Sequence, residues 1–128
     1  MLGLVRGRLM TLTVTSLLAA AVLAPAAEAK SPPKGTYECV IGANTQLFGE
    51  IKIKGGGKYT YSRFGKTGTF KAGKTKKKFS GETRGYPISF KGGGLNKFKG
   101  FWFTSTTGTH EIALHRPGSD FINIYCDD

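Results

Sequence analysis

Two histidines are the side chains of this sequence best suited to acid–base or metal chemistry, and their spacing argues against a shared site. His110 and His115 lie five residues apart in a segment with β-strand alternation, which places them on opposite faces of the strand. His110 falls on the face of Ile112 and Leu114, whereas His115 falls on the face of Glu111. A shared metal ion would need both rings on one side. We therefore predict no metal site, one histidine at the edge of the core and one at the surface.

The acidic side chains form no catalytic or metal-binding pattern. None has the spacing of a metal-ligand set, and the final Asp127–Asp128 pair is interpreted as a solvated tail. The sequence also lacks G-x-S-x-G, H-E-x-x-H and phosphate-binding glycine motifs. We predict no catalytic residue, no cofactor and no enzyme. A small hydrolase remains the alternative, because two carboxylates from distant segments can meet in space.

The positive signal in the composition is an excess of lysine. Without its first 29 residues the chain carries a net charge of +10, and lysine greatly outnumbers arginine. A field of this sign attracts polyanions, and lysines act as point charges rather than as bidentate phosphate ligands. We predict contact with anionic envelope polymers or a membrane surface, without a specific nucleic-acid motif or small-molecule site. The alternative is that the lysines only solubilise the chain and guard a strand edge. The candidate anion-binding residues crowd one predicted hairpin: Lys71, Lys74, Lys76, Lys77 and Lys78.

Aromatic rings fall on both faces of one predicted strand. Phe98 and Trp102 share one face, while Phe101 and Phe103 share the other with two lysines. Exposed rings beside lysines could stack on sugars or bases. The alternative is that a loop or a second sheet covers them. Phe101 and Phe103 are therefore the candidate exposed aromatics.

Short β-strands must position all of these side chains. Apolar and polar residues alternate over short segments separated by glycine-rich turns, which is typical of an antiparallel β-protein. We expect a turn at residues 65–68 and a loop at 81–85. One all-β domain is predicted at residues 36–128, after a flexible lead at 30–35. Its predicted fold is a small antiparallel up-and-down barrel of about eight strands, with a two-sheet β-sandwich as the alternative.

The only two cysteines, Cys39 and Cys126, predict one disulfide between the first and last strands. Each cysteine lies on the apolar face of its strand, as a buried cross-strand bridge requires. Neighbouring first and last strands would close the sheet and remove its exposed edges. A barrel of this size is filled by its own side chains, so we expect no roomy internal cavity.

The N-terminal segment predicts export. Residues 1–29 combine two arginines, an uncharged apolar run from Leu9 to Ala24, and small residues before a cleavage site between Ala29 and Lys30. The run is 16 residues long, short of the roughly 20 that span a bilayer. No cysteine lies near the cleavage site. We predict a secreted or periplasmic protein with a cleaved signal peptide, no lipid anchor and no transmembrane segment.

Several strand and turn motifs carry a resemblance. The pattern G-x-Y-x-C at Gly35–Cys39, an Ile-rich strand, a Gly-rich turn and K-Y-x-Y precede G-T-F at Gly68–Phe70 and a closing Tyr125-Cys126. The chain resembles small uncharacterised secreted β-proteins of bacteria, and this resemblance implies no activity. It is more weakly similar to inhibitors of c-type lysozyme, which are eight-stranded barrels with a Y-x-C opening. The Ser-Gly-rich inhibitory signature of that family is absent, and two basic proteins repel one another.

Together these features predict a secreted bacterial, monomeric, non-enzymatic binding protein. An inhibitor of lysozymes or proteases is the alternative among binding functions.

Overall fold

The computed structural model describes residues 31–42 and 46–128. The predicted signal peptide and its Ala29–Lys30 cleavage site lie outside the described residues. Pro32 is buried, and the carbonyl of Pro33 accepts a hydrogen bond from the Tyr37 hydroxyl at 2.8 Å. Part of the predicted flexible lead is therefore held against the first strand.

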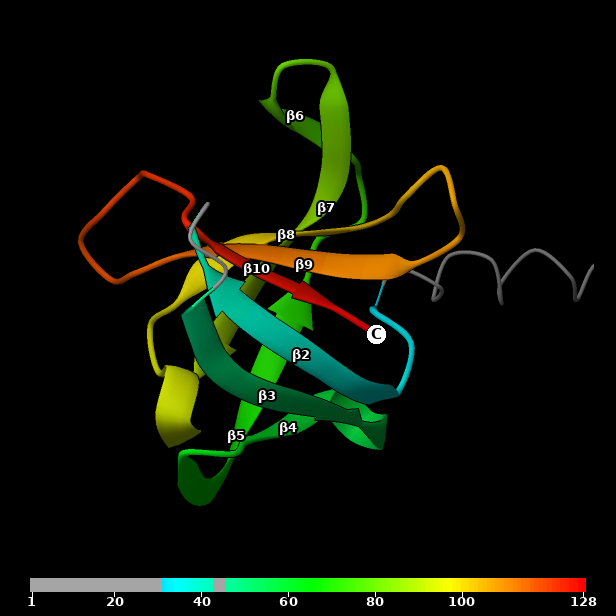
Figure 1. Cartoon of the computed structure of the whole chain (residues 1–128). Helices are drawn as coiled ribbons and strands as arrows, with labels where there is room; N and C mark the ends of the chain where they lie inside the picture. The colour runs from blue at the N-terminus through cyan, green and yellow to red at the C-terminus, as the bar shows by residue number, and fades with distance from the viewer. Residues whose placement is uncertain (1–30, 43–45) are drawn as a thin grey trace, which may run out of the picture.

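Nine strands and no α-helix occur in the described residues (Figure 1). Two short 3-10 turns, η3 (Gly55–Gly57) and η4 (Gly93–Leu95), interrupt the chain. The strands are β2 (Gly35–Ile41), β3 (Gln46–Lys54), β4 (Lys58–Tyr61), β5 (Phe64–Ala72), β6 (Lys77–Ser80), β7 (Thr83–Lys91), β8 (Lys99–Thr104), β9 (His110–His115) and β10 (Ile124–Asp127).

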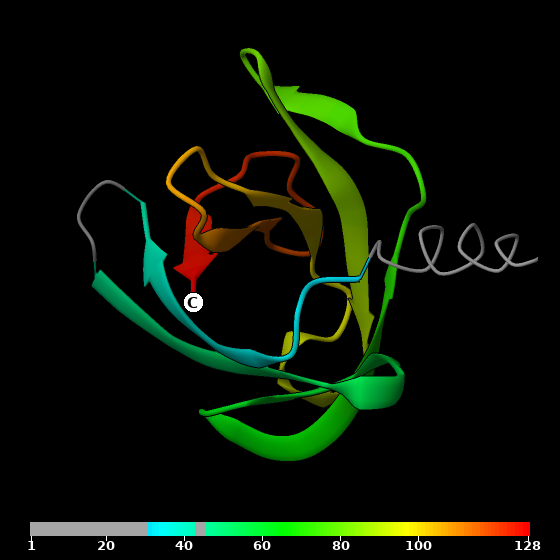
Figure 2. The ribbon, with the colours of Figure 1, turned by 90° about the vertical axis from the view of Figure 1, so that its right-hand side faces the viewer.

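Eight of these strands close into an antiparallel barrel. The sheet runs β5-β4-β3-β2-β10-β9-β8-β7, and a further pairing of β5 with β7 completes the ring (Figure 2). The prediction of a closed barrel is confirmed. The ninth strand, β6, pairs with β7 and forms a hairpin that projects from the barrel (Figure 1).

Strand β7 is longer than the sequence predicts. Its first part pairs with β6, whereas its last four residues pair with β5. The predicted loop at 81–85 is therefore partly wrong, because Thr83 already belongs to β7. Pro87 lies where the two partners change over, and its carbonyl accepts a hydrogen bond from the Gly73 amide at 2.7 Å.

The predicted turn at residues 65–68 is also wrong, because these residues lie inside β5. The chain reverses at Ser62 and Arg63 instead. Gly68 serves close packing rather than a turn: a Cβ atom there would overlap the Tyr59 ring and the Gly92 carbonyl. A glycine in a strand can mark such a close approach, and sequence alone does not separate this role from a turn.

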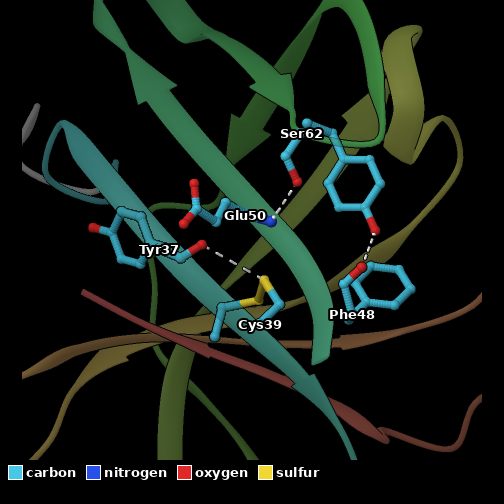
Figure 3. The surroundings of a disulfide bond; sticks show 7 residues. Tyr37, Cys39, Phe48, Glu50 and Ser62 are labelled. Atoms are coloured by element: carbon cyan, nitrogen blue, oxygen red, sulfur yellow. Dashed lines mark hydrogen bonds between the residues drawn. A yellow bond between two sulfur atoms is a disulfide. The ribbon is translucent and has the colours of Figure 1, made fainter. Parts of the chain in front are cut away.

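The predicted disulfide joins the first and last strands of the barrel. Cys39 of β2 lies directly opposite Cys126 of β10 and is bonded to it. Both side chains are buried beside Tyr37 (Figure 3). Aromatic and aliphatic side chains fill the interior around them, as expected for a small barrel. The fully buried members of this core include Ile51, Tyr59, Leu95, Ile112, Leu114 and Ile124.

No helix of membrane-spanning length and hydropathy occurs in the described part of the chain.

Candidate functional site

The register of four strands lines up basic and polar side chains on the outside of the barrel. Lys71 of β5 lies opposite Ser89 of β7. Ser89 in turn lies opposite Lys99 of β8, and Lys99 lies opposite His115 of β9. Since neighbouring strands are about 4.8 Å apart, these residues form one continuous row.

This row borders a groove of about 820 Å³ on the barrel exterior. Lys91 and Lys97 add two ammonium groups to its lining, and residues 117–120 form another part of it. We call this feature the basic groove. Among its described lining residues, Asp120 is the only acid and none is an arginine. The groove therefore collects four lysines and a histidine from separate segments: Lys71, Lys91, Lys97, Lys99 and His115.

Lys97 has a backbone conformation that lysine rarely adopts. Its φ of 71° lies in the left-handed region, which glycine occupies without steric cost. Its amide donates a hydrogen bond to the Phe90 carbonyl at 2.9 Å, and the neighbouring Asn96 side chain accepts one from the Gly92 amide at 2.7 Å. The turn thus holds a lysine at the groove where glycine would be the less strained residue.

The five candidate anion-binding lysines fall into two groups. Lys71 lies in the barrel wall and belongs to the basic groove. Lys74 and Lys76 lie in the link before β6, while Lys77 and Lys78 lie in β6 itself. These four side chains are all exposed. We call these four the hairpin lysines. They form a second positive region outside the basic groove to which Lys71 belongs.

The candidate aromatics Phe101 and Phe103 point away from the barrel interior but are half-buried. Phe79 of β6 covers them, with its ring stacked on Phe101 at 4.6 Å between centroids and tilted against Phe103 at 5.4 Å. Trp102, between them in sequence, is buried on the opposite face. The alternative in which another segment covers the rings is therefore the one observed, and the covering segment is the β6–β7 hairpin.

A second hollow, of about 550 Å³, lies beside these rings. The aromatic side chains that line it are Phe79, Phe101, Phe103, Phe121 and Tyr125, and we call it the aromatic hollow. Phe121 and Tyr125 are 72% and 45% exposed, so their rings are available to a ligand. His115 and Asp120 line both this hollow and the basic groove.

The barrel also carries a row of carboxylates. Glu50 of β3 lies opposite Glu38 of β2, Glu38 lies opposite Asp127 of β10, and Asp127 lies opposite Glu111 of β9. Like charges directly opposite one another destabilise a sheet. Burial, and secondarily the charge of Asp127, raise the pKa of the Glu111 carboxyl. Asp127 is exposed, but its interpretation as part of a tail is wrong, because it lies in β10 between two acidic neighbours.

We expect Glu111→Gln to stabilise the protein at neutral pH by roughly 0.2–1 kcal/mol, the size of a cross-strand pair term. The folded-state pKa of Glu111 lies above its unfolded value, so ionisation disfavours the folded state. The gain should be complete above the folded pKa and vanish below the unfolded pKa of about 4.3. Urea denaturation from pH 3 to pH 8 measures it. Glu82→Gln, at an exposed hairpin position, is the control, and an equal gain there would contradict the assignment.

His110 and Asp128 form a hydrogen-bonded pair at one end of the barrel. The His110 Nδ1 and an Asp128 carboxylate oxygen lie 2.8 Å apart, and the His110 backbone amide donates to the other oxygen at 2.9 Å. The bond to the His110 side chain lowers the pKa of the Asp128 carboxyl. This contact stabilises the fold above the ordinary Asp pKa and is lost as pH falls through the folded value. Asp128 is therefore not a free tail residue.

The two histidines occupy separate places, as their spacing predicts. His110 is at the edge of the core with Asp128, whereas His115 faces the exterior hollows. Within the described residues no group of three or more His, Cys, Asp or Glu side chains is placed to hold a metal ion.

Comparison of the chain with protein-family models, with curated proteins and with solved structures finds no match.

Several residues of the candidate site lie outside the set that the sequence singles out. Lys91 stands alone in the sequence, and Phe79, Phe121 and Tyr125 each have the context of an ordinary strand or turn residue. Lys97 and Lys99 are visible there only as neighbours of the aromatic segment. No local signal groups these residues, because their proximity depends on which strands pair.

Proposed function

We propose that this protein is an exported, non-enzymatic binding protein for anionic polymers, and that the basic groove is its binding site. The observation that carries the proposal is the convergence of Lys71, Lys91, Lys97 and Lys99 on one groove with a single acid in its described lining. Ammonium groups gathered in a concave site raise the local concentration of anions and speed their capture.

The shape of the site favours a chain over a flat surface. A groove accepts an extended polymer, whereas a planar membrane would meet mainly the residues around its rim. The hairpin lysines are exposed and lie outside the basic groove, although Lys78 also lines the aromatic hollow. They supply further attraction without enclosing a ligand in the groove. We assign them to capture of the polymer and the groove lysines to holding it.

The predicted compartment supports this proposal. A disulfide persists in oxidising environments such as the periplasm and the extracellular space, and the N-terminal sequence has the features of a signal peptide. Both environments contain anionic envelope polymers.

Three quadruple Lys→Gln variants with the same net charge test the proposal. The first removes the groove lysines 71, 91, 97 and 99, and the second removes the hairpin lysines 74, 76, 77 and 78. The third removes four exposed lysines from other segments, at positions 34, 52, 54 and 58. Binding of fluorescent polyglutamate is measured by anisotropy for the protein without its first 29 residues, at several salt concentrations.

We expect the groove variant to lose roughly 100-fold or more in affinity, given about 1 kcal/mol per lysine close to an anionic surface. The third variant should lose much less, and binding of the unaltered protein should weaken steeply with salt. Equal losses in all three variants would reduce the effect to net charge and overturn the proposal. A larger loss in the hairpin variant would move the site to the hairpin.

A further inference from the structure

We infer that the polymer is an acidic polysaccharide, which lies with its sugar rings against the aromatic hollow and its acid groups in the basic groove. This inference rests on the proposed function and adds the chemical class of the ligand.

An apolar row runs beside the basic row on the outside of the barrel. Tyr125 of β10 lies opposite Ala113 of β9, which lies opposite Phe101 of β8. Phe101 in turn lies opposite Pro87 of β7. On β7, β8 and β9, each residue of the apolar row lies two positions from a residue of the basic row in the same strand. The two rows are therefore parallel and about 7 Å apart.

A third hollow, of about 440 Å³, connects the two regions. It shares Lys71, Lys99 and His115 with the basic groove, and it shares Phe101 and His115 with the aromatic hollow. His115 lines all three hollows. The barrel exterior thus offers one continuous track, charged at one end and aromatic at the other.

The carboxylates give this track a direction. Glu111 lies two residues from Ala113 on the side away from His115, and it belongs to the acidic row with Asp127. The apolar row is therefore bordered on one side by Ser89, Lys99 and His115 of the basic row and, on β9 and β10, on the other side by the carboxylates of Glu111 and Asp127. Ala113 is buried and Phe101 lies under Phe79, so the rings that a polymer can reach here are Phe121 and Tyr125. A polymer whose sugar rings pack on these two side chains must turn its acid groups away from the carboxylates of Glu111 and Asp127 and toward the basic groove, because like charges repel.

A sugar ring with an acid substituent fits this pattern. One face of the ring presents C–H groups that pack against an aromatic ring, and the carboxylate accepts hydrogen bonds from ammonium groups. Nucleic acids also combine rings with anions, but their phosphates are preferentially recognised by arginine. The described linings of the three hollows contain lysine and no arginine. Export away from the cytoplasm also favours an envelope polysaccharide.

Single substitutions of the two exposed rings test the inference. Phe121→Ala and Tyr125→Ala remove rings that are 72% and 45% exposed, and Leu47→Ala and Phe64→Ala, at 53% and 46% exposure outside the linings, are matched controls. The probes are labelled oligomers of galacturonic acid of increasing length, polyglutamate of equal charge, and single-stranded oligothymidylate. Binding is measured by anisotropy at fixed ionic strength, and folding by near-ultraviolet circular dichroism.

We expect the unaltered protein to bind the galacturonate oligomers more tightly than polyglutamate, with an affinity that rises with chain length until both ends of the track are occupied. Each aromatic variant should lose about three- to tenfold in galacturonate affinity and keep its polyglutamate affinity, while both controls keep both affinities.

Two outcomes would overturn the inference. If the aromatic variants bind galacturonate as the unaltered protein does, the rings do not contact the ligand; the proposed function then stands as long as the groove lysines still govern polyglutamate binding. If oligothymidylate binds more tightly than galacturonate at equal charge and its binding falls in the aromatic variants, the ligand is a nucleic acid. If the groove variant and the hairpin variant both bind polyglutamate as tightly as the unaltered protein does, the proposed function itself is wrong.

Discussion

Replacing both cysteines, as Cys39→Ala/Cys126→Ala, is expected to lower the free energy of unfolding by about 3–4 kcal/mol. The bond joins the first strand of the barrel to the last and spans 87 positions of sequence. A cross-link over so long a loop strongly restricts the unfolded chain, and a domain of this size has a total stability of only about 5–15 kcal/mol. Guanidinium denaturation of the two proteins measures the difference.

Chemical reduction of the unaltered protein is the companion measurement, because it opens the bond and leaves both side chains in the core. Agreement between the reduced protein and the double variant would assign the loss to the cross-link rather than to a cavity. A loss below about 1 kcal/mol in both would show that pairing of β2 with β10 closes the barrel without help from the disulfide.

Gly100→Ala is expected to destabilise the protein by about 3 kcal/mol. Gly100 is buried in β8, opposite Leu114 of β9. A Cβ atom at this position would overlap the carbonyl oxygen of Ala113 and lie 2.9 Å from the Cα of Leu114. These are backbone atoms of a paired strand, so relief requires β8 and β9 to separate, and forced overpacking typically costs about 1–3 kcal/mol or more.

Gly65→Ala is the matched control for this prediction. Gly65 lies in β5 and is exposed, and a Cβ atom added there would meet no other atom within 4 Å. The same chemical change there should alter the unfolding free energy by less than about 1 kcal/mol, and it should be neutral or stabilising because alanine restricts the unfolded chain. Equal effects at the two positions would contradict the close approach of β8 and β9. Thermal or urea denaturation distinguishes the two results.

The position of the β8–β9 contact also matters for the proposed site. Lys99 and Phe101, on either side of Gly100, face His115 and Ala113 across this pair of strands. They belong to the basic row and to the apolar row respectively. A shift between β8 and β9 would therefore separate the two parts of the track as well as weaken the fold.

The class of fold is predictable because it depends on local properties of the chain. Alternation of apolar and polar residues in segments such as Gln46–Lys54 determines which side chains face the core. Because the glycine-rich connections are short, consecutive strands must be antiparallel neighbours. The two cysteines then supply the one long-range constraint that can be recognised directly in the sequence. Since Cys39 and Cys126 lie on apolar faces of the first and last strands, their bond favours a closed barrel over a sandwich, and the structure has that barrel.

Local patterns fail where glycine has two uses or where a strand changes partners. Gly68 has the sequence context of a turn residue, yet it lies in β5 under Tyr59. Thr83 belongs to a segment predicted as a loop, yet it begins a strand that pairs first with β6 and then with β5. Neither distinction is contained in the residue types, because each depends on how the segment packs: Gly68 lies against Tyr59 of β4 and Gly92, and Thr83 pairs with Ser80 across the hairpin.

The sequence by itself therefore determined an all-β chain with a lysine excess, two histidines on opposite faces and one disulfide. Only the tertiary structure decided that Lys71, Lys91, Lys97 and Lys99 share a groove, that Phe79 covers Phe101, and that acidic, apolar and basic rows lie side by side. The physical reason is register. The alternation of apolar and polar residues determines which side chains of a strand face outward. The neighbours of an outward-facing residue, however, are determined by hydrogen-bonded pairing between strands, and that pairing exists only in the closed barrel.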